Sequence, residues 1–229
     1  MKELFSAIAV VLTLALPAFS AASPSRPGPY GSFFLGASIP LDTDATGVDF
    51  LSSPAVSFDD RVALDPGIDV GGTAGYDFGS IRLEGELSYK YSAIASVTEK
   101  AGGLRFRNVD GNLGALAVMA NAFFDLHNGT PVTPYWGGGV GFASLHLTDT
   151  FGTDPTTGLT GPLYLGDTDT VFAYQAGLGL EIALDRQLSL DLGYRYLGTS
   201  RARFGANEDI TTDLKFESHN ATVGIRARF

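Results

Sequence analysis

The sequence contains no cysteine among its 229 residues. Without thiols the chain has no disulfide framework and no cysteine on which a lipid anchor could be attached. Basic residues are also scarce, since 15 Lys and Arg stand against 25 Asp and Glu and give a formal net charge of −10. A nucleic-acid-binding protein needs a basic surface, so the composition excludes this class of partner.

Long apolar runs are absent as well. The one apolar run near the start covers residues 4–16, which is too short for a membrane-spanning helix of about 20 residues. It follows a lysine-containing tip and precedes a stretch of small residues, which is the layout of a secretory signal peptide. We therefore expect residues 1–22 to be a cleaved signal peptide rather than an uncleaved anchor. Residues 23–229 should then form a single domain.

The end of the sequence, residues 216–229, alternates strictly between two kinds of side chain. Successive side chains on a strand point to opposite faces, so the pattern predicts a strand with one apolar face. The segment ends on Phe229, and a membrane barrel needs aromatic residues where its apolar face meets the boundary. It resembles the closing strand of bacterial outer-membrane proteins, whose terminal aromatic is a signal for barrel assembly. The apolar positions are Ala221, Val223, Ile225, Ala227 and Phe229.

Seven further segments alternate in a similar way, so the sequence predicts eight strands. An even number is typical of single-chain bacterial barrels, and only helices or closed barrels satisfy every backbone group in lipid. The predicted fold class is all-β, an eight-stranded antiparallel up-and-down transmembrane β-barrel. The predicted strands cover residues 30–39, 67–78, 80–91, 111–125, 131–147, 169–184, 187–198 and 216–229.

The connections between the predicted strands alternate between long and short. Outer-membrane barrels have long extracellular loops and short periplasmic turns, so we expect the long connections outside the cell. These connections are rich in Asp, Gly, Ser and Thr, which predicts solvated acidic loops that do not order themselves. Their charge favours cationic or divalent-ion-bridged partners. The long connections are residues 40–66, 92–110, 148–168 and 199–215.

Alternation alone does not separate a membrane barrel from a soluble one such as a lipocalin, because both have one apolar face. The aromatic residues favour the membrane barrel, since they gather at both ends of the apolar faces, where a bilayer has its two boundaries. We therefore expect the apolar faces to contact lipid. The predicted bands are Tyr89, Tyr91, Phe172, Tyr174, Tyr194 and Tyr196 near the long loops, and Tyr76, Phe78, Trp136 and Phe229 near the short turns.

The charged faces of these strands should then point into the lumen. Eight strands leave a lumen that side chains can fill, and buried charges must be paired to be tolerated. We expect ion pairs that plug the lumen, with Glu86 and Asp191 near mid-height and Lys90 and Arg195 nearer the long loops. Removing one partner, as in Glu84→Ala, should destabilise by a few kcal/mol. The predicted lumen ion-pair residues are Arg82, Glu84, Glu86, Lys90, Glu181, Asp191, Arg195, Arg226 and Arg228, with Asp77 and Asp125 on the same faces.

Three motifs on the fifth, sixth and seventh predicted strands resemble the opacity-type surface antigens, an outer-membrane family of Gram-negative bacteria. They are residues 135–143 (YWGGGVGFA), 172–177 (FAYQAG) and 188–196 (LSLDLGYRY), and the closing residues 219–225 (HNATVGI) are similar too. The resemblance covers the layout of the mature chain and, in motif, its second half. It implies an eight-stranded barrel in the bacterial outer membrane with exposed loops, a role as surface antigen, adhesin or invasion factor, and no catalytic residues.

Two segments invite a chemical interpretation. Glu217-Ser218-His219 can be compared with barrel-type lipid deacylases, which use an outward His with a Ser and an acidic partner. Neighbouring residues on one strand point to opposite faces, however, so Ser218 and His219 should not meet. Residues 42–47 resemble the first half of a calcium loop, but the twelfth position is Ser53 rather than Glu. We therefore expect no catalytic, cofactor-binding or metal site.

The expected function is that of a non-enzymatic integral outer-membrane protein, a surface antigen or an adhesion or structural barrel with exposed acidic loops. Two alternatives stay open: a small-solute porin, although eight strands seldom leave an open lumen, and a lipid-modifying enzyme. The expected partners are outer-membrane lipid and lipopolysaccharide, the barrel-assembly machinery and a host surface ligand. No cofactor and no nucleic acid are expected.

Overall fold

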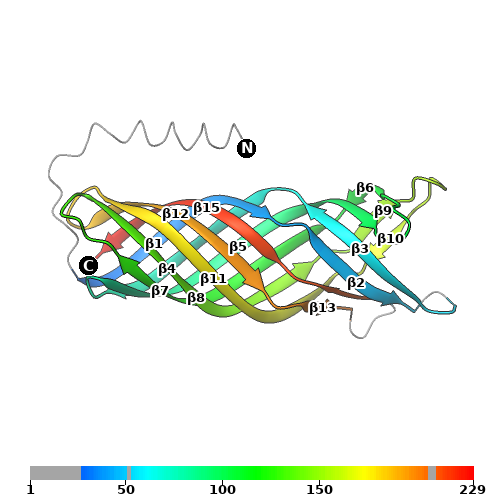
Figure 1. Ribbon diagram of the computed structural model, residues 1–229, viewed down its shortest axis with the longest axis horizontal. Helices are drawn as coiled ribbons and strands as arrows, with labels where there is room; N and C mark the ends of the chain where they lie inside the picture. The colour runs from blue at the N-terminus through cyan, green and yellow to red at the C-terminus, as the bar shows by residue number, and fades with distance from the viewer. Residues whose placement is uncertain (1–26, 51–52, 206–209) are drawn as a thin grey trace.

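The computed structural model describes residues 27–50, 53–205 and 210–229. The expected signal peptide, residues 1–22, lies outside these residues. Within the described part of the chain, no helix is long and apolar enough to cross a membrane. The described residues form strands that wind around one long axis (Figure 1).

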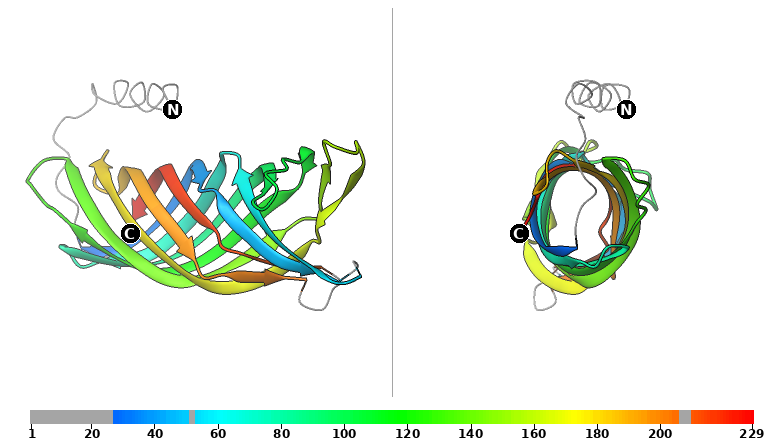
Figure 2. Two further views of the ribbon diagram at one scale, coloured as in Figure 1. Left: turned by 45° about the vertical axis from the view of Figure 1, so that its right-hand side comes forward. Right: turned by 90° about the vertical axis from the view of Figure 1, so that its left-hand side faces the viewer.

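Eight long strands form a closed ring, because each pairs with a neighbour on both sides and every pairing is antiparallel. The view along the long axis shows the ring end-on (Figure 2, right). The ring confirms the predicted fold class and all eight predicted strands. In ring order the strands are β1 (Gly28–Pro40), β4 (Gly67–Asp77), β5 (Ile81–Glu99), β7 (Asn112–Asp125), β8 (Val132–Leu147), β11 (Asp167–Ala183), β12 (Leu188–Thr199) and β15 (Glu217–Arg228).

The two faces of β5 show how the sequence pattern becomes a barrel wall. Arg82 is 0% exposed and its neighbour Leu83 is 50% exposed, and this alternation continues as far as Ser92. Charged and hydroxyl side chains therefore line the lumen, whereas Leu, Ile and aromatic side chains cover the outside. A soluble barrel would have the opposite arrangement, because water would contact the outer face. The outer face of the ring is therefore suited to contact with the apolar interior of a membrane.

The four long connections are not the unstructured loops that the acidic composition predicted. Their described residues form seven additional strands, and β5 continues to Glu99 instead of ending near residue 91. Four of these strands extend the barrel wall in the order β13-β14-β2-β3-β5, and three form a small separate sheet in the order β10-β9-β6. The seven strands are β2 (Thr43–Asp49), β3 (Val56–Leu64), β6 (Arg107–Asp110), β9 (Thr150–Thr153), β10 (Thr160–Tyr164), β13 (Ala202–Phe204) and β14 (Ile210–Leu214).

An apolar core explains why these segments are ordered. Each additional wall strand contributes one or two apolar side chains, and these pack inside the barrel against apolar residues of the ring strands. The prediction of disordered loops was wrong because it weighed total charge and missed these apolar side chains. The core consists of Ala45, Val62, Leu64, Ile94, Val97, Leu113, Ala115, Ala117, Met119, Ala143, Leu145, Leu147, Tyr164, Val171, Ala173, Leu197, Ala202, Phe204, Leu214 and Phe216.

Candidate functional site

The barrel has two unlike ends. At the turn end, short connections join β4 to β5, β7 to β8 and β11 to β12. Both ends of the described barrel lie there, since the backbone N–H of Phe229 donates to the carbonyl of Pro29 at 3.1 Å (Figure 1). At the loop end, the seven additional strands continue beyond the ring. The functional surfaces of the molecule follow from this asymmetry.

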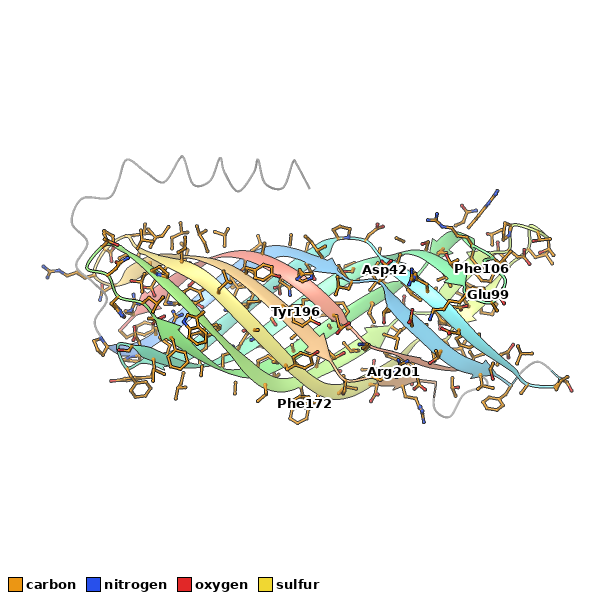
Figure 3. All side chains as sticks on the ribbon, viewed as in Figure 1. Asp42, Glu99, Phe106, Phe172, Tyr196 and Arg201 are labelled. Carbon is orange, nitrogen blue, oxygen red and sulfur yellow. The ribbon has the colours of Figure 1, made fainter. Side chains whose placement is uncertain are left out.

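Two bands of exposed aromatic side chains surround the outer face of the barrel. Near the turn end, Trp136 stacks on Phe124 with ring centroids 5.0 Å apart, and Tyr76 and Phe78 lie 4.7 Å apart. Phe229 is 84% exposed at the same end. The predicted loop-side band also lies on the outer surface, where Phe172, labelled in Figure 3, is exposed and Tyr196 is half-buried. The bands have the arrangement that membrane boundaries favour.

Inside the barrel, Glu181 of β11 is the centre of a charged layer close to the turn end. Arg226 and Arg228 of β15 both donate to its carboxylate, and Arg82 of β5 approaches it at 3.5 Å. Arg226 also donates to Asp191 of β12 at 2.7 Å. These side chains are buried, and each charge meets an opposite one. This pairing is what makes several charges tolerable in a small closed space.

Two further carboxylates complete the layer at the turn end. Arg82 Nε lies 3.2 Å from Asp125 Oδ2, and Arg228 Nη2 lies 3.6 Å from Asp77 Oδ2. The Arg82 guanidinium also lies over the Tyr135 ring, 4.6 Å from its centroid. A guanidinium offers both a planar fork of donors and a flat face, so arginine can pair and stack at once.

A second layer lies at mid-height around Glu86 of β5. Arg195 of β12 donates to Glu86 at 2.5 Å and lies 3.6 Å from Glu84. The amides of Asn121 and Gln175 each donate to Glu86 at 2.9 Å. Three donors from three other strands therefore hold one buried carboxylate at this height.

A third pair and the apolar core occupy the rest of the lumen. Lys90 Nζ lies 3.1 Å from Asp69 Oδ1 and 3.1 Å from the Ser88 hydroxyl. Met119 and Ala117 of β7, which pair with Glu86 and Ser88 of β5, already belong to the apolar core. The turn half of the lumen is therefore charged and paired, whereas the loop half is packed with apolar side chains.

The structure brings each predicted lumen residue into an ion pair, but two of these residues lie at other heights along the barrel than expected. Arg195 pairs with Glu86 at mid-height rather than beside Lys90, and Asp191 pairs with Arg226 in the turn-end layer. Strands of a barrel are staggered, so equal distances from the strand ends do not mean equal heights. Sequence reasoning also missed Asp69, although it shares the inward face of β4 with the predicted Asp77.

Buried tyrosines were missed as well, because aromatic residues were assigned to the membrane bands. The Tyr30 hydroxyl donates to Glu84 at 2.5 Å, and the Tyr135 hydroxyl donates to Asp191 at 2.8 Å. The inward position of Tyr30 could have been found, since it has the opposite parity to Phe33 and Leu35 on the same strand. Inward glycines make room for this network: a Cβ on Gly139 would lie 2.0 Å from Asn121 Oδ1.

The structure does not assemble a Ser–His–acid site on β15. Ser218 is 0% exposed and points into the lumen, where it interacts with Asn220. His219 lies on the outer face, and its Nδ1 is 2.6 Å from the Tyr194 hydroxyl. Glu217 accepts from the Tyr196 hydroxyl at 2.9 Å on the same face. His219 therefore belongs to the loop-side aromatic band, on the opposite face of the strand from Ser218.

The segment that resembled half a calcium loop is part of a strand. Residues 43–49 form β2 and pair with β3, so they do not make the turn that a calcium loop requires. Asp44 lies 2.9 Å from Lys100 Nζ, and this hydrogen bond holds the pKa of Asp44 below its ordinary value. Among the described residues, no cluster of three or more His, Cys, Asp or Glu side chains has a geometry suited to a metal ion.

These features agree with a comparison against known families. The profile of the outer membrane protein beta-barrel domain family matches residues 6–229. The chain belongs to this family. The family match confirms the resemblance to outer-membrane surface barrels that the sequence motifs indicated. The protein is located in the bacterial outer membrane.

Relatives of this family member include outer membrane protein PagN of Salmonella typhimurium, which is 26% identical over 185 residues, covering 71% of this chain and 74% of PagN. An uncharacterized protein of Brucella abortus is 43% identical over 132 residues, covering 48% of this chain and 46% of that protein. Among solved structures, the outer membrane protein OprG of Pseudomonas aeruginosa matches with a TM-score of 0.62 and 14% identity, covering 91% of this chain and 99% of OprG. The likeness to OprG concerns the fold alone.

Proposed function

We propose that this protein is a non-enzymatic surface barrel whose loop-end strands present an adhesion or recognition surface outside the cell. The division of the barrel supports the proposal most directly. Ion-paired layers and an apolar core fill the lumen, while at the loop end four ordered strands extend the wall and three form a small separate sheet. The part of the molecule that is free to meet a partner is therefore the loop end.

The orientation and partners form part of the proposal. The loop end faces outside and the turn end faces the periplasm, as in barrels with long outer loops and short inner turns. The barrel-assembly machinery recognises Phe229, and outer-membrane lipid and lipopolysaccharide surround the two aromatic bands. A host surface ligand contacts the loop-end strands.

The two other function classes have less support. Conduction by a porin needs a continuous polar path, but the loop half of the lumen is packed with apolar side chains. A lipid-modifying enzyme needs an activated nucleophile on the outer face, and the candidate Ser218 points into the lumen. We therefore favour a surface role.

An attachment assay tests the proposal. A non-adherent bacterium that produces the protein should attach to epithelial cells more strongly than the same bacterium with an empty vector. Replacing the β9–β10 hairpin, residues 150–164, with a short Gly-Ser turn should reduce attachment, whereas replacing residues 127–129 at the turn end should not. Heat-modifiable migration on gels checks that both variants fold. Equal attachment with and without the protein would reject the proposed role.

A further inference from the structure

A groove opens at the loop end where the β5–β6 connection meets the β9–β10 turn. Its volume is about 660 Å³, and it is lined by the end of β5, residues 103–109 and Pro155. Small-molecule sites have volumes of about 300–1,000 Å³, so the groove has the size of a ligand rather than of a single ion. Phe106, labelled in Figure 3, marks its position.

Two arginines of the groove lie on the same side of an extended segment. The backbone N–H of Phe106 donates to the carbonyl of Val97 at 3.0 Å, and its side chain packs against the apolar core. Arg105 and Arg107, one residue before and one after, are exposed and line the groove. Side chains two residues apart on an extended chain share a face, so both guanidinium groups can reach one ligand.

Neither arginine is neutralised within the described part of the chain. The ion pairs at the loop end use Lys100, Arg203 and Lys215 instead. The carboxylate nearest in sequence to Pro155 is Asp154, which accepts from the backbone N–H groups of Thr156 and Thr157 in its own turn. Both arginines therefore bring a charge without an ion-pair partner to the groove, on a chain whose formal net charge is −10.

The backbone next to Arg107 has an irregular conformation. Asn108 has φ 48°, and the register between β6 and β9 shifts between Arg107 and Asp110. Bulges of this kind redirect side chains and are frequent beside binding sites. Asn108 also lines the groove, where its amide adds hydrogen-bonding capacity between the two arginines and Pro155.

We propose that this groove binds a phosphorylated sugar. Paired guanidinium groups match the oxygens of a phosphate, and a phosphate alone would leave most of the groove empty. Ser96 and Asn108 can bond to hydroxyl groups, while Leu104, Val109 and Pro155 offer apolar contact to a sugar ring. The inference rests on the proposed outward orientation of the loop end. The groove then lies about 15 Å along β5 beyond the Tyr91 band, above the lipid headgroups and among surface saccharides.

Binding of glucose 1-phosphate, glucose and inorganic phosphate to the purified protein in detergent tests the inference by calorimetry. We expect glucose 1-phosphate to bind best and glucose not to bind. The double variant Arg105→Gln/Arg107→Gln should lose affinity at least about tenfold, because it loses charge-assisted hydrogen bonds. The matched control Arg61→Gln/Arg201→Gln removes the same charge elsewhere at the loop end and should bind as the original protein does. Heat-modifiable migration verifies folding of both.

A second arm distinguishes a lipid-linked sugar from a free one. Lipopolysaccharide and its dephosphorylated form are compared with glucose 1-phosphate as ligands of the same proteins. Preference for intact lipopolysaccharide identifies the membrane's own saccharide, and equal affinity for glucose 1-phosphate identifies a free sugar phosphate. Equal loss in both double variants, or equal binding of glucose and glucose 1-phosphate, would overturn the inference. These measurements do not involve cell attachment. The groove can therefore fail to bind a sugar phosphate while the proposed surface role holds, and the surface role can fail while the groove binds.

Discussion

Arg195 Nη1 lies 2.5 Å from Glu86 Oε2, and the two residues come from strands on opposite sides of the ring, β12 and β5. Backbone pairing joins each strand only to its neighbours. This ion pair instead ties two distant parts of the wall together through the lumen. It also occupies the space that a solute would need at mid-height.

We expect Glu86→Ala to destabilise the barrel by about 3–5 kcal/mol, because it leaves Arg195 buried without its closest partner. The double variant Glu86→Ala/Arg195→Ala should cost less than this single change. Glu84→Ala should also destabilise by a few kcal/mol, since Glu84 accepts from Tyr30 and faces Arg195. Urea unfolding in lipid vesicles measures each value. Additive single and double effects would mean that water solvates each charge independently.

Phe229→Asp should block insertion into the outer membrane. Phe229 is 84% exposed at the turn end, so its loss removes little packing from the barrel and chiefly removes the proposed assembly signal. The matched control is Phe78→Asp, which places the same charge at an exposed aromatic of the same end. Cell fractionation should find the Phe229 variant in the periplasm and the control in the membrane. Normal outer-membrane levels of Phe229→Asp would rule out this role.

Residue alternation explains why the ring could be predicted. The period of two along residues 80–91 and 187–198 places each side chain on one of two faces, and this property depends only on local sequence. The exposed position of Phe33 and the buried position of Arg82 follow from it. The choice between a membrane barrel and a soluble one needed a second signal, which the positions of Trp136 and Tyr194 supplied.

Contacts between distant segments could not be predicted in the same way. The pairing of Asp213 on β14 with Thr46 on β2 joins residues that are far apart in the chain, and acidic composition suggested that neither was ordered. The partner of Arg195 depends on strand stagger, which a sequence pattern does not define. The groove at Arg105 depends on the bulge in β6. In the sequence, the only indication of a groove there was two arginines in an acidic region.

Trypsin added to intact cells should cut at the loop end and spare the turn end. Lys100 and Arg105 are cleavable residues of the β5–β6 connection, whereas Arg186 is an exposed cleavable residue at the turn end. If the loop end faces outward, mass spectrometry should find cleavage after Lys100 or Arg105 and an intact 184–187 turn. Because the additional strands are ordered, cutting should be confined to their connections. Cleavage after Arg186 alone would show that the topology is inverted.

Asp60 on β3 should make the loop-end sheet more stable below the raised pKa of its carboxyl group than above it. Burial raises the pKa of Asp60 above its ordinary value, against the opposing effect of the hydrogen bond from Tyr164. The folded state therefore binds a proton more readily than the unfolded state, and stability rises as the pH falls through the folded pKa. Hydrogen exchange of β3 amides at two pH values measures this.

The control for this effect is Asp60→Asn, which has no charge to titrate and keeps an oxygen that can accept from Tyr164. Its β3 amides should exchange more slowly than those of the original protein at neutral pH, and they should lose the pH-dependent difference. Unchanged pH dependence in Asp60→Asn would assign the effect to another group.

Single-channel recording in planar bilayers tests most directly whether the lumen is closed. With the purified protein inserted, we expect no steady currents, because the Arg195–Glu86 pair and the apolar core around Leu145 and Phe216 fill successive cross-sections. Glu86→Ala/Arg195→Ala should also remain silent, since the apolar core still closes the loop half. Steady single-channel currents from the unmodified protein would contradict a closed lumen and would favour a small pore over a surface barrel.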